Sequence, residues 1–197
     1  VHVGDYVDRG PDTCGVLERL AQPLPGGVRR ILLRGNHDQW FKEFVEGRRC
    51  DADWIVHGGI ETLASYGVEW QPHLPPPQRL GTALTALHRA MPVTHRRLLA
   101  GLRSIWIQGD YVFCHAGIRP SRPIDRQVDE DLLWIREPFL SWRGELSSVV
   151  VHGHTVVEAP VLLPHRIAID TGAVWTGCLT CLVLEEDKRR FLATSPG

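Results

Sequence analysis

Two strand-to-turn motifs near the start of the chain constrain its fold most. Residues 1–10 are VHVGDYVDRG, and residues 32–38 are LLRGNHD. In each motif an apolar, strand-like run ends at a glycine, and carboxylate, amide, imidazole or guanidinium groups follow. A helix-like pattern comes next in both places, so strand, turn and helix alternate twice, which indicates parallel strands with crossover helices. The polar groups are of the kinds that bind divalent cations and phosphate oxygens.

Turn residues and apolar periodicity predict the boundaries of the other elements. Asp12 or Thr13 can cap a helix over 15–22, and a strand follows over 28–33. Apolar residues recur at helical spacing over 40–45, and Gly47 ends that helix. The prolines within 71–78 predict an extended connection. Further along we expect helices over 80–90, 94–102 and 129–141, a hairpin over 104–114, and strands over 149–151, 166–169, 179–184 and 190–193.

This order of elements predicts an α/β fold, with a mixed sheet that is parallel early and antiparallel late. The 197 residues are 43% hydrophobic with a formal net charge of −1. Such a chain can bury one good core, and its charge gives no case for a nucleic-acid or membrane partner. Five scattered cysteines indicate free thiols in a reducing compartment, so we expect a cytoplasmic protein. Cys178 and Cys181 form a lone CxxC in an apolar run, and we expect both in a core strand.

Four strand ends finish in residues that can bind metal or phosphate. They are GDYVDRG (4–10), RGNHD (34–38), FCHAG (113–117) and VVHGHT (150–155). Open α/β sheets bind ligands at the carboxyl ends of their strands. The sequence therefore predicts that polar side chains from these four places gather around a shared cation that faces a phosphoryl group.

These motifs resemble the signature of the phosphoprotein phosphatases, the binuclear-metal Ser/Thr branch of the calcineurin-like metallophosphoesterases. The family pattern is GDxHG, GDxVDRG, GNHE and two later histidine motifs. GDYVDRG matches the second element, GNHD matches the third with Asp38 in place of Glu, and FCHAG and HGHT resemble the later ones. Segments such as WIVHGGIETLASYG (54–67) resemble the bacterial members. The resemblance implies the calcineurin-like fold, with layered mixed β-sheets flanked by helices.

The resemblance also implies a metal centre with two divalent ions, Mn²⁺ foremost and Fe or Zn²⁺ as alternatives. Asp5 would bridge the two ions, and Asn36, His115 and His154 would complete the shell of the second. The implied reaction is hydrolysis of phosphoserine or phosphothreonine in a protein or peptide, by direct attack of a hydroxide that bridges the metals.

Four further residues would carry the catalytic roles of the family. His37 would protonate the leaving oxygen, and Asp8 would hydrogen-bond His37 and fix its tautomer. Arg9 would clamp the phosphate oxygens. Arg136, in WIRE, is the candidate for a second arginine that binds phosphate.

Besides Asp38 in GNHD, the chain departs from the family pattern because the GDxHG motif is absent. In the family its Asp and His supply other ligands of the first metal. We therefore expect residues 1–197 to be an N-terminally truncated piece of a single metallophosphoesterase domain that lacks its first βα unit. Such a piece should be weakly active or inactive by itself and of low stability, with an exposed sheet edge.

Two other functions stay open. GNHD also resembles the symmetrical diadenosine tetraphosphate hydrolases, so the same site could cleave dinucleoside polyphosphates. The third alternative is an inactive pseudophosphatase that binds partners through the fold. A cleft wall over 53–67 and 71–78 with aromatic rings that stack on bases would favour nucleotides, whereas an open groove would favour phosphoproteins.

A few residues have weaker assignments. His152 would either contact a metal ligand without binding the metal itself or face solvent. His57 would line the mouth of the substrate site or be an ordinary loop residue. Asp170 is more simply a turn former than a partner of a ligand loop. The remaining assignments are core or cleft-wall positions for Trp54, Trp134, Trp142 and Trp175.

Overall fold

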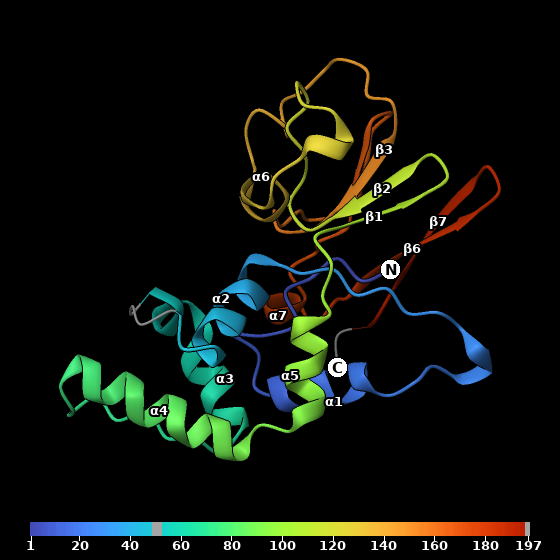
Figure 1. Cartoon of the computed structure of the whole chain (residues 1–197). Coiled ribbons are helices and arrows are strands. Elements are labelled where there is room, and N and C mark those ends of the chain that lie inside the picture. Colours follow the sequence, from blue (N-terminus) through green and yellow to red (C-terminus); the bar gives the residue numbers. More distant parts are fainter. Residues whose placement is uncertain (49–52, 196–197) are drawn as a thin grey trace. The chain divides into compact units, whose positions relative to one another are not determined.

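The chain divides into two units, which the computed structural model describes over residues 1–48 and 53–195 (Figure 1). The sheet unit consists of Val1–Gly4, Ile31–Gly35 and Arg103–Gly197. The helical unit consists of Asp5–Arg30 and Asn36–Leu102. The chain therefore passes from one unit to the other at the Gly4–Asp5 and Gly35–Asn36 peptide bonds, inside the two motifs that opened the sequence. The prediction of a single domain stays a prediction.

A five-stranded mixed sheet forms the centre of the sheet unit, in the order β1-β2-β3-β5-β4. β2, β3 and β5 run parallel, and β1 and β4 pair antiparallel at the two edges. The predicted hairpin is confirmed, and Gly109 in its turn has a φ of +56°. The strands are β1 (Ile105–Gln108), β2 (Tyr111–Cys114), β3 (Val149–His152), β4 (Val161–Leu162) and β5 (Arg166–Ala168).

A separate antiparallel hairpin, β6 (Thr180–Glu185) and β7 (Lys188–Ala193), completes the strands of the described chain in this unit. Short helical segments are η3 (Ile124–Arg126), α6 (Asp129–Trp134) and α7 (Ala173–Thr176).

α6 is much shorter than the predicted helix over 129–141. The chain leaves the helix at Ile135, whose ψ is 135°. Pro138 follows three residues later; it lacks an N–H and disfavours helical geometry in the residue before it. The apolar residues of 129–141 still reach the core, because Leu132, Ile135 and Phe139 pack with Val112 and Val150 of the sheet.

The two N-terminal motifs enter the structure as single bridges rather than full strands. His2 pairs in parallel with Leu32, and Leu33 pairs in parallel with Arg103. The expected strand over 28–33 is thus limited to its last residues, but its parallel direction is confirmed. Gly4 has a φ of +97°, and a Cβ there would lie 2.5 Å from the Gly35 nitrogen, so only glycine fits this close approach.

Five α-helices surround the core of the helical unit (Figure 1). Asp12 caps the first by accepting a hydrogen bond from the Gly15 nitrogen at 2.8 Å, as expected. The largest buried side chains are Trp54, Phe41, Phe44 and Leu63. The helices are α1 (Thr13–Ala21), α2 (Asn36–Val45), α3 (Ile60–Ser65), α4 (Pro76–Ala90) and α5 (Val93–Ala100), with short turns η1 (Pro25–Gly27) and η2 (Ile55–Gly59).

Three expectations from the sequence are wrong in detail. α4 begins at Pro76, inside the segment predicted to be extended, because the first turn of a helix does not need the N–H that proline lacks. Cys181 is exposed and Cys178 only half-buried, since β6 and β7 are outside the core clusters found among the described residues. Trp175 is 65% exposed and is likewise no core residue. Cys50 lies outside the described residues.

No helix in residues 1–48 or 53–195 combines the length and the apolar character that crossing a bilayer requires.

Candidate active site

A buried carboxylate, Asp38, shapes the loop that carries Asp5. Its Oδ2 accepts a hydrogen bond from the Asp5 nitrogen at 2.7 Å, and its Oδ1 accepts one from the Tyr6 nitrogen at 2.9 Å. This loop needs support, because Asp5, Asp8 and Arg9 all have positive φ values between 58° and 71°. Asp38 is fully buried in the first turn of α2, so it acts as a rigid clamp on the loop.

The sequence did not identify this role of Asp38, because the residue matters through the backbone of a segment 33 positions away.

Asp5 in turn contacts the start of α2, since its Oδ1 accepts a hydrogen bond from the His37 nitrogen at 3.1 Å. Negative charge is favourable at a helix N-terminus, where backbone N–H groups lack partners within the helix. Asn36 and His37 are both nearly fully buried. The aspartate, the amide and the imidazole of the two opening motifs are therefore neighbours within the helical unit.

His37 and Asp8 form a buried pair. The His37 Nδ1 lies 2.6 Å from the Asp8 Oδ2. The Asp8 carboxylate also accepts hydrogen bonds from Trp54 Nε1, at 3.0 and 3.1 Å, and from the Thr62 hydroxyl at 2.8 Å. This confirms the predicted contact between Asp8 and His37. It also shows that Trp54, assigned only a packing role, holds the carboxylate in place.

The surroundings of His37 favour its protonated form. Burial lowers the pKa of His37, but the hydrogen bond to Asp8 and the charges of Asp5 and Asp8 raise it further than burial lowers it. The net result is a pKa above the ordinary value, despite an opposing effect of Arg9. Burial raises the pKa of Asp8, and the donors on His37, Thr62 and Trp54 oppose that rise. An imidazole that keeps its proton near neutral pH can act as a general acid.

Arg9 is positioned through its backbone by Gly58 in η2. The Arg9 nitrogen donates to the Gly58 carbonyl oxygen at 3.4 Å. Gly58 has a φ of +117°, and a Cβ there would lie 2.4 Å from the Arg9 nitrogen. The glycine that follows His57 is therefore required for this close approach. The Arg9 residue itself is exposed.

The sheet unit brings together two histidines. His115 Nε2 lies 3.2 Å from His154 Nδ1, and both atoms can bind a metal ion. The Nδ1–H of His115 donates to the Val3 carbonyl at 2.8 Å, which leaves Nε2 with its lone pair. His154 lies just after β3 with a φ of +64°, and its neighbour Gly153 donates its N–H to the His115 carbonyl at 2.8 Å. Two such imidazole nitrogens suit a borderline divalent cation.

Arg136 joins this pair. Its Nη1 lies 2.9 Å from the His154 Nε2, and the Trp134 ring packs edge-on against the His154 ring with centroids 6.1 Å apart. The guanidinium from WIRE is therefore beside a candidate metal ligand.

The predicted site residues thus form two groups. Asp5, Asp8, Arg9, Asn36 and His37 gather in the helical unit. His115, Arg136 and His154 gather in the sheet unit. The ligand set that joins members of both groups around one metal stays a prediction.

His152 is fully buried, so its solvent-facing alternative is wrong. Its Nδ1 lies 3.1 Å from the Gly153 carbonyl oxygen, and the Phe139 ring packs against it with centroids 5.0 Å apart. It does not share a strand face with His154, because β3 ends at His152. Asp170 is a turn former, as expected, since its Oδ1 accepts from the Gly172 nitrogen at 3.0 Å.

Comparisons with known proteins agree with this geometry. The calcineurin-like phosphoesterase family matches residues 1–173. A bis(5'-nucleosyl)-tetraphosphatase PrpE [asymmetrical] of Geobacillus thermodenitrificans is 28% identical over 206 residues, which cover 91% of this chain and 73% of the relative. A serine/threonine-protein phosphatase 1 of Salmonella typhimurium is 30% identical over 191 residues, with 91% and 76% covered.

A crystal structure provisionally described as a diadenosine tetraphosphatase has the same fold, with a TM-score of 0.63 at 23% identity over 98% of this chain and 79% of that one. The predicted α/β fold with layered mixed sheets and flanking helices is therefore confirmed. The chain belongs to the calcineurin-like phosphoesterase family.

Proposed function

We propose that the protein hydrolyses dinucleoside polyphosphates in a metal-dependent reaction, and that phosphoproteins are not its main substrates. The observation that carries this choice is the set of relatives described as bis(5'-nucleosyl)-tetraphosphatases, seven of which match across 91% of this chain. The sequence had favoured a phosphoserine and phosphothreonine phosphatase, with dinucleotides as the alternative. The comparisons support that alternative better.

Asp5, Asn36, His115 and His154 would hold the divalent ions. The donor set supports this, because carboxylate, amide and imidazole groups together suit Mn²⁺, Fe or Zn²⁺. Chain connectivity supports it as well. Val3 accepts the hydrogen bond that orients His115, and Asp5 follows two residues later, so its Cα is within about 8 Å of the Val3 Cα. When bound, the ions supply positive charge for the phosphoryl oxygens and acidify water.

The chain's own residues would then divide the remaining work. His37 holds a proton that it can give to the departing phosphate oxygen, and Asp8 orients the ring and stabilises its charged form. Arg9 and Arg136 offer planar guanidinium groups that bind phosphate oxygens in pairs. A dinucleoside polyphosphate is an anion with several phosphates in a row, so it can engage both arginines.

Hydrolysis of phosphoproteins is the second candidate. It is favoured by the relative in Salmonella typhimurium described as serine/threonine-protein phosphatase 1, which is 30% identical to this chain.

The test compares substrates on the full-length product of the gene, after chelation and reloading with Mn²⁺. We expect kcat/KM for diadenosine tetraphosphate to exceed that for a phosphothreonine peptide at least about tenfold. Chromatography of the products distinguishes a 1+3 division of the four phosphates from a 2+2 division. A preference for the peptide, or no hydrolysis of either substrate with Mn²⁺, Fe²⁺ or Zn²⁺, would contradict the proposal.

Metal binding is measured separately by calorimetry with Mn²⁺. We expect His115→Ala and His154→Ala to weaken it, and the exposed His73→Ala to leave it unchanged.

A further inference from the structure

An aromatic ledge, formed by Trp40 and His57, extends from the general acid to the surface of the helical unit. The Trp40 ring centroid lies 5.5 Å from that of His37, at an interplanar angle of 72°. The His57 ring centroid also lies 5.5 Å from that of Trp40, at an interplanar angle of 56°. Trp40 is three residues beyond His37 on α2, so the two side chains share one face of the helix.

Both rings of the ledge are partly open to solvent and fixed in position. Trp40 is half-buried and packs on the apolar core, and His57 is exposed. The Nδ1 of His57 lies 2.7 Å from the Asp53 carbonyl oxygen, which fixes the ring. Gly58, the next residue, holds the backbone of Arg9. The ledge is therefore attached to the same turn that positions an arginine proposed to bind phosphate.

We infer that Trp40 and His57 form the stacking site for a nucleobase of the substrate. This inference rests on the proposed function and names the feature that would select nucleotides over phosphopeptides. A nucleotide carries its base one sugar away from its phosphate, so an aromatic surface beside the proton donor is within reach of that base. Stacking on aromatic rings tolerates every base, because every base has a π-face. The sequence had assigned Trp40 only to the apolar face of a helix.

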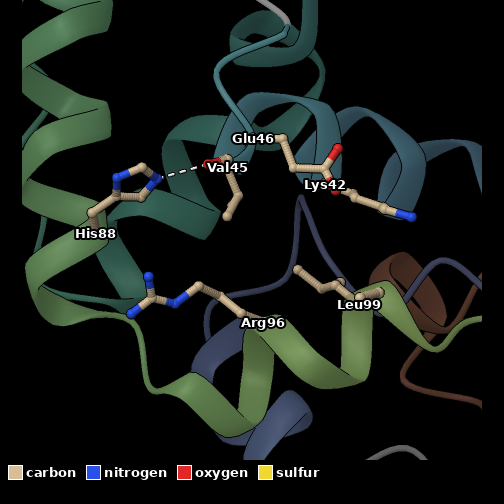
Figure 2. A pocket seen from close by; sticks show the side chains of 7 residues that line it. Lys42, Val45, Glu46, His88, Arg96 and Leu99 are labelled. Carbon is tan, nitrogen blue, oxygen red and sulfur yellow. Dashed lines mark hydrogen bonds between the residues drawn. The ribbon is translucent and has the colours of Figure 1, made fainter.

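The cavity of about 230 Å³ at the other end of α2 is a poorer candidate for the base. Figure 2 shows that Lys42, Val45, His88, Arg96 and Leu99 line it, together with Glu46 and Ala100. Two of its polar side chains already contact carbonyl groups of the protein. His88 lies 2.7 Å from the Val45 carbonyl oxygen through Nε2, and Arg96 donates to the Met91 carbonyl. Among the described residues that line the cavity, His88 alone carries an aromatic ring. The cavity therefore offers no pair of rings.

The test compares AMP with ribose 5-phosphate, two probes that differ only in the base. We expect the native protein with Mn²⁺ to bind AMP more tightly, by calorimetry. Trp40→Ala should weaken AMP binding about tenfold and leave ribose 5-phosphate unchanged, whereas Trp40→Phe should retain most of the preference. AMP should also quench tryptophan emission in the native protein, and much less in Trp40→Phe.

Two further variants keep the test decisive. His57→Ala removes an exposed ring with little risk to folding and should weaken AMP binding severalfold. Trp70→Ala is the matched control, because Trp70 is also half-buried on the same core but contacts Arg79 rather than His37. Equal losses for AMP and ribose 5-phosphate in Trp40→Ala, or an unchanged ratio in both ledge variants, would overturn the ledge while hydrolysis of dinucleotides still stands. Absence of any hydrolysis would instead refute the proposed function.

Discussion

The Nδ1 atom of His37 lies 2.6 Å from the Oδ2 atom of Asp8, at a site from which solvent is largely excluded. Trp54 and Thr62 complete the ring of donors around the carboxylate. A fully satisfied buried network of this kind is stronger and more rigid than its separate bonds. The orientation of the His37 ring is therefore set by Asp8, Trp54 and Thr62, which all lie outside α2.

Asp8→Asn should reduce kcat about 10²–10⁴-fold and change KM little, because the amide cannot stabilise a charged imidazole. Steady-state kinetics on diadenosine tetraphosphate checks this. Thr62→Val is the control: it removes one donor and keeps the shape, so its effect on kcat should be much smaller. Equal activities of Asp8→Asn and the native protein would show that His37 is not the proton donor.

Gly58→Ala should raise KM for phosphate substrates about tenfold or more, and kcat should fall as well. The added methyl group would lie 2.4 Å from the Arg9 nitrogen, and the φ of +117° is unfavourable for alanine. Arg9 must therefore move away from its position. Kinetics at several phosphate-product concentrations would show the weaker anion binding; an unchanged inhibition constant for phosphate would argue against this role of Arg9.

Gly81→Ala should stabilise the protein by about 0.5–1 kcal/mol in its free energy of unfolding. Gly81 lies inside α4, and nothing lies within 4 Å of where a Cβ would be placed. Alanine costs less conformational entropy there than glycine does. Urea denaturation measures the change, and activity should stay at the native level. A lower denaturation midpoint would mean that this part of α4 is not helical in solution.

Stability should fall as the pH drops from about 6.5 to 4. Burial, Arg166 and His115 lower the pKa of His152 to about 4, while the hydrogen bond to the Gly153 carbonyl opposes the shift. Between these pH values the unfolded chain binds a proton that the native protein excludes. His152 therefore contributes stability that is complete above its unfolded pKa and is lost on acidification, at up to about 1.4 kcal/mol per pH unit.

His152→Gln isolates that effect. Denaturation midpoints at pH 7 and pH 5 should differ less in this variant than in the native protein. His165 also has a pKa lowered by burial, so some acid sensitivity should persist in both proteins. If the variant and the native protein lose stability equally, His152 is not the group responsible.

Local sequence signals were sufficient to predict much of the fold. In the site they identified one of the two residues of each contact. The Asp12 cap, the hairpin turn at Gly109 and the helical spacing over 40–45, now part of α2, depend on neighbours within a few residues, and they are confirmed. The resemblance to the phosphoprotein phosphatases implied the contact between Asp8 and His37, and the structure confirms that contact.

Residues whose role depends on distant chain segments were not predictable in this way. Asp38 acts on the Asp5 loop, and Trp54 acts on a carboxylate 46 positions away. A motif match names Asp38 and an aromatic residue type places Trp54 in the core or cleft wall, but neither signal shows which polar group the side chain touches. The prediction that Cys181 lies in a core strand was wrong, because an apolar run does not reveal whether the strand is covered by the rest of the protein.

The hydrogen bond from His115 to residue 3 ends on a main-chain carbonyl. No substitution of the Val3 side chain removes that carbonyl acceptor. Mutations at position 3 therefore leave the orientation of the His115 imidazole unchanged. The Val3 side chain packs close to Gly153, where an added Cβ would lie 3.3 Å from the valine methyl. Selection can therefore change residue 3 for its van der Waals fit to Gly153 without disturbing the His115 ring. Substitutions that change the orientation of the His115 ring should instead be those that move the backbone of residues 1–4.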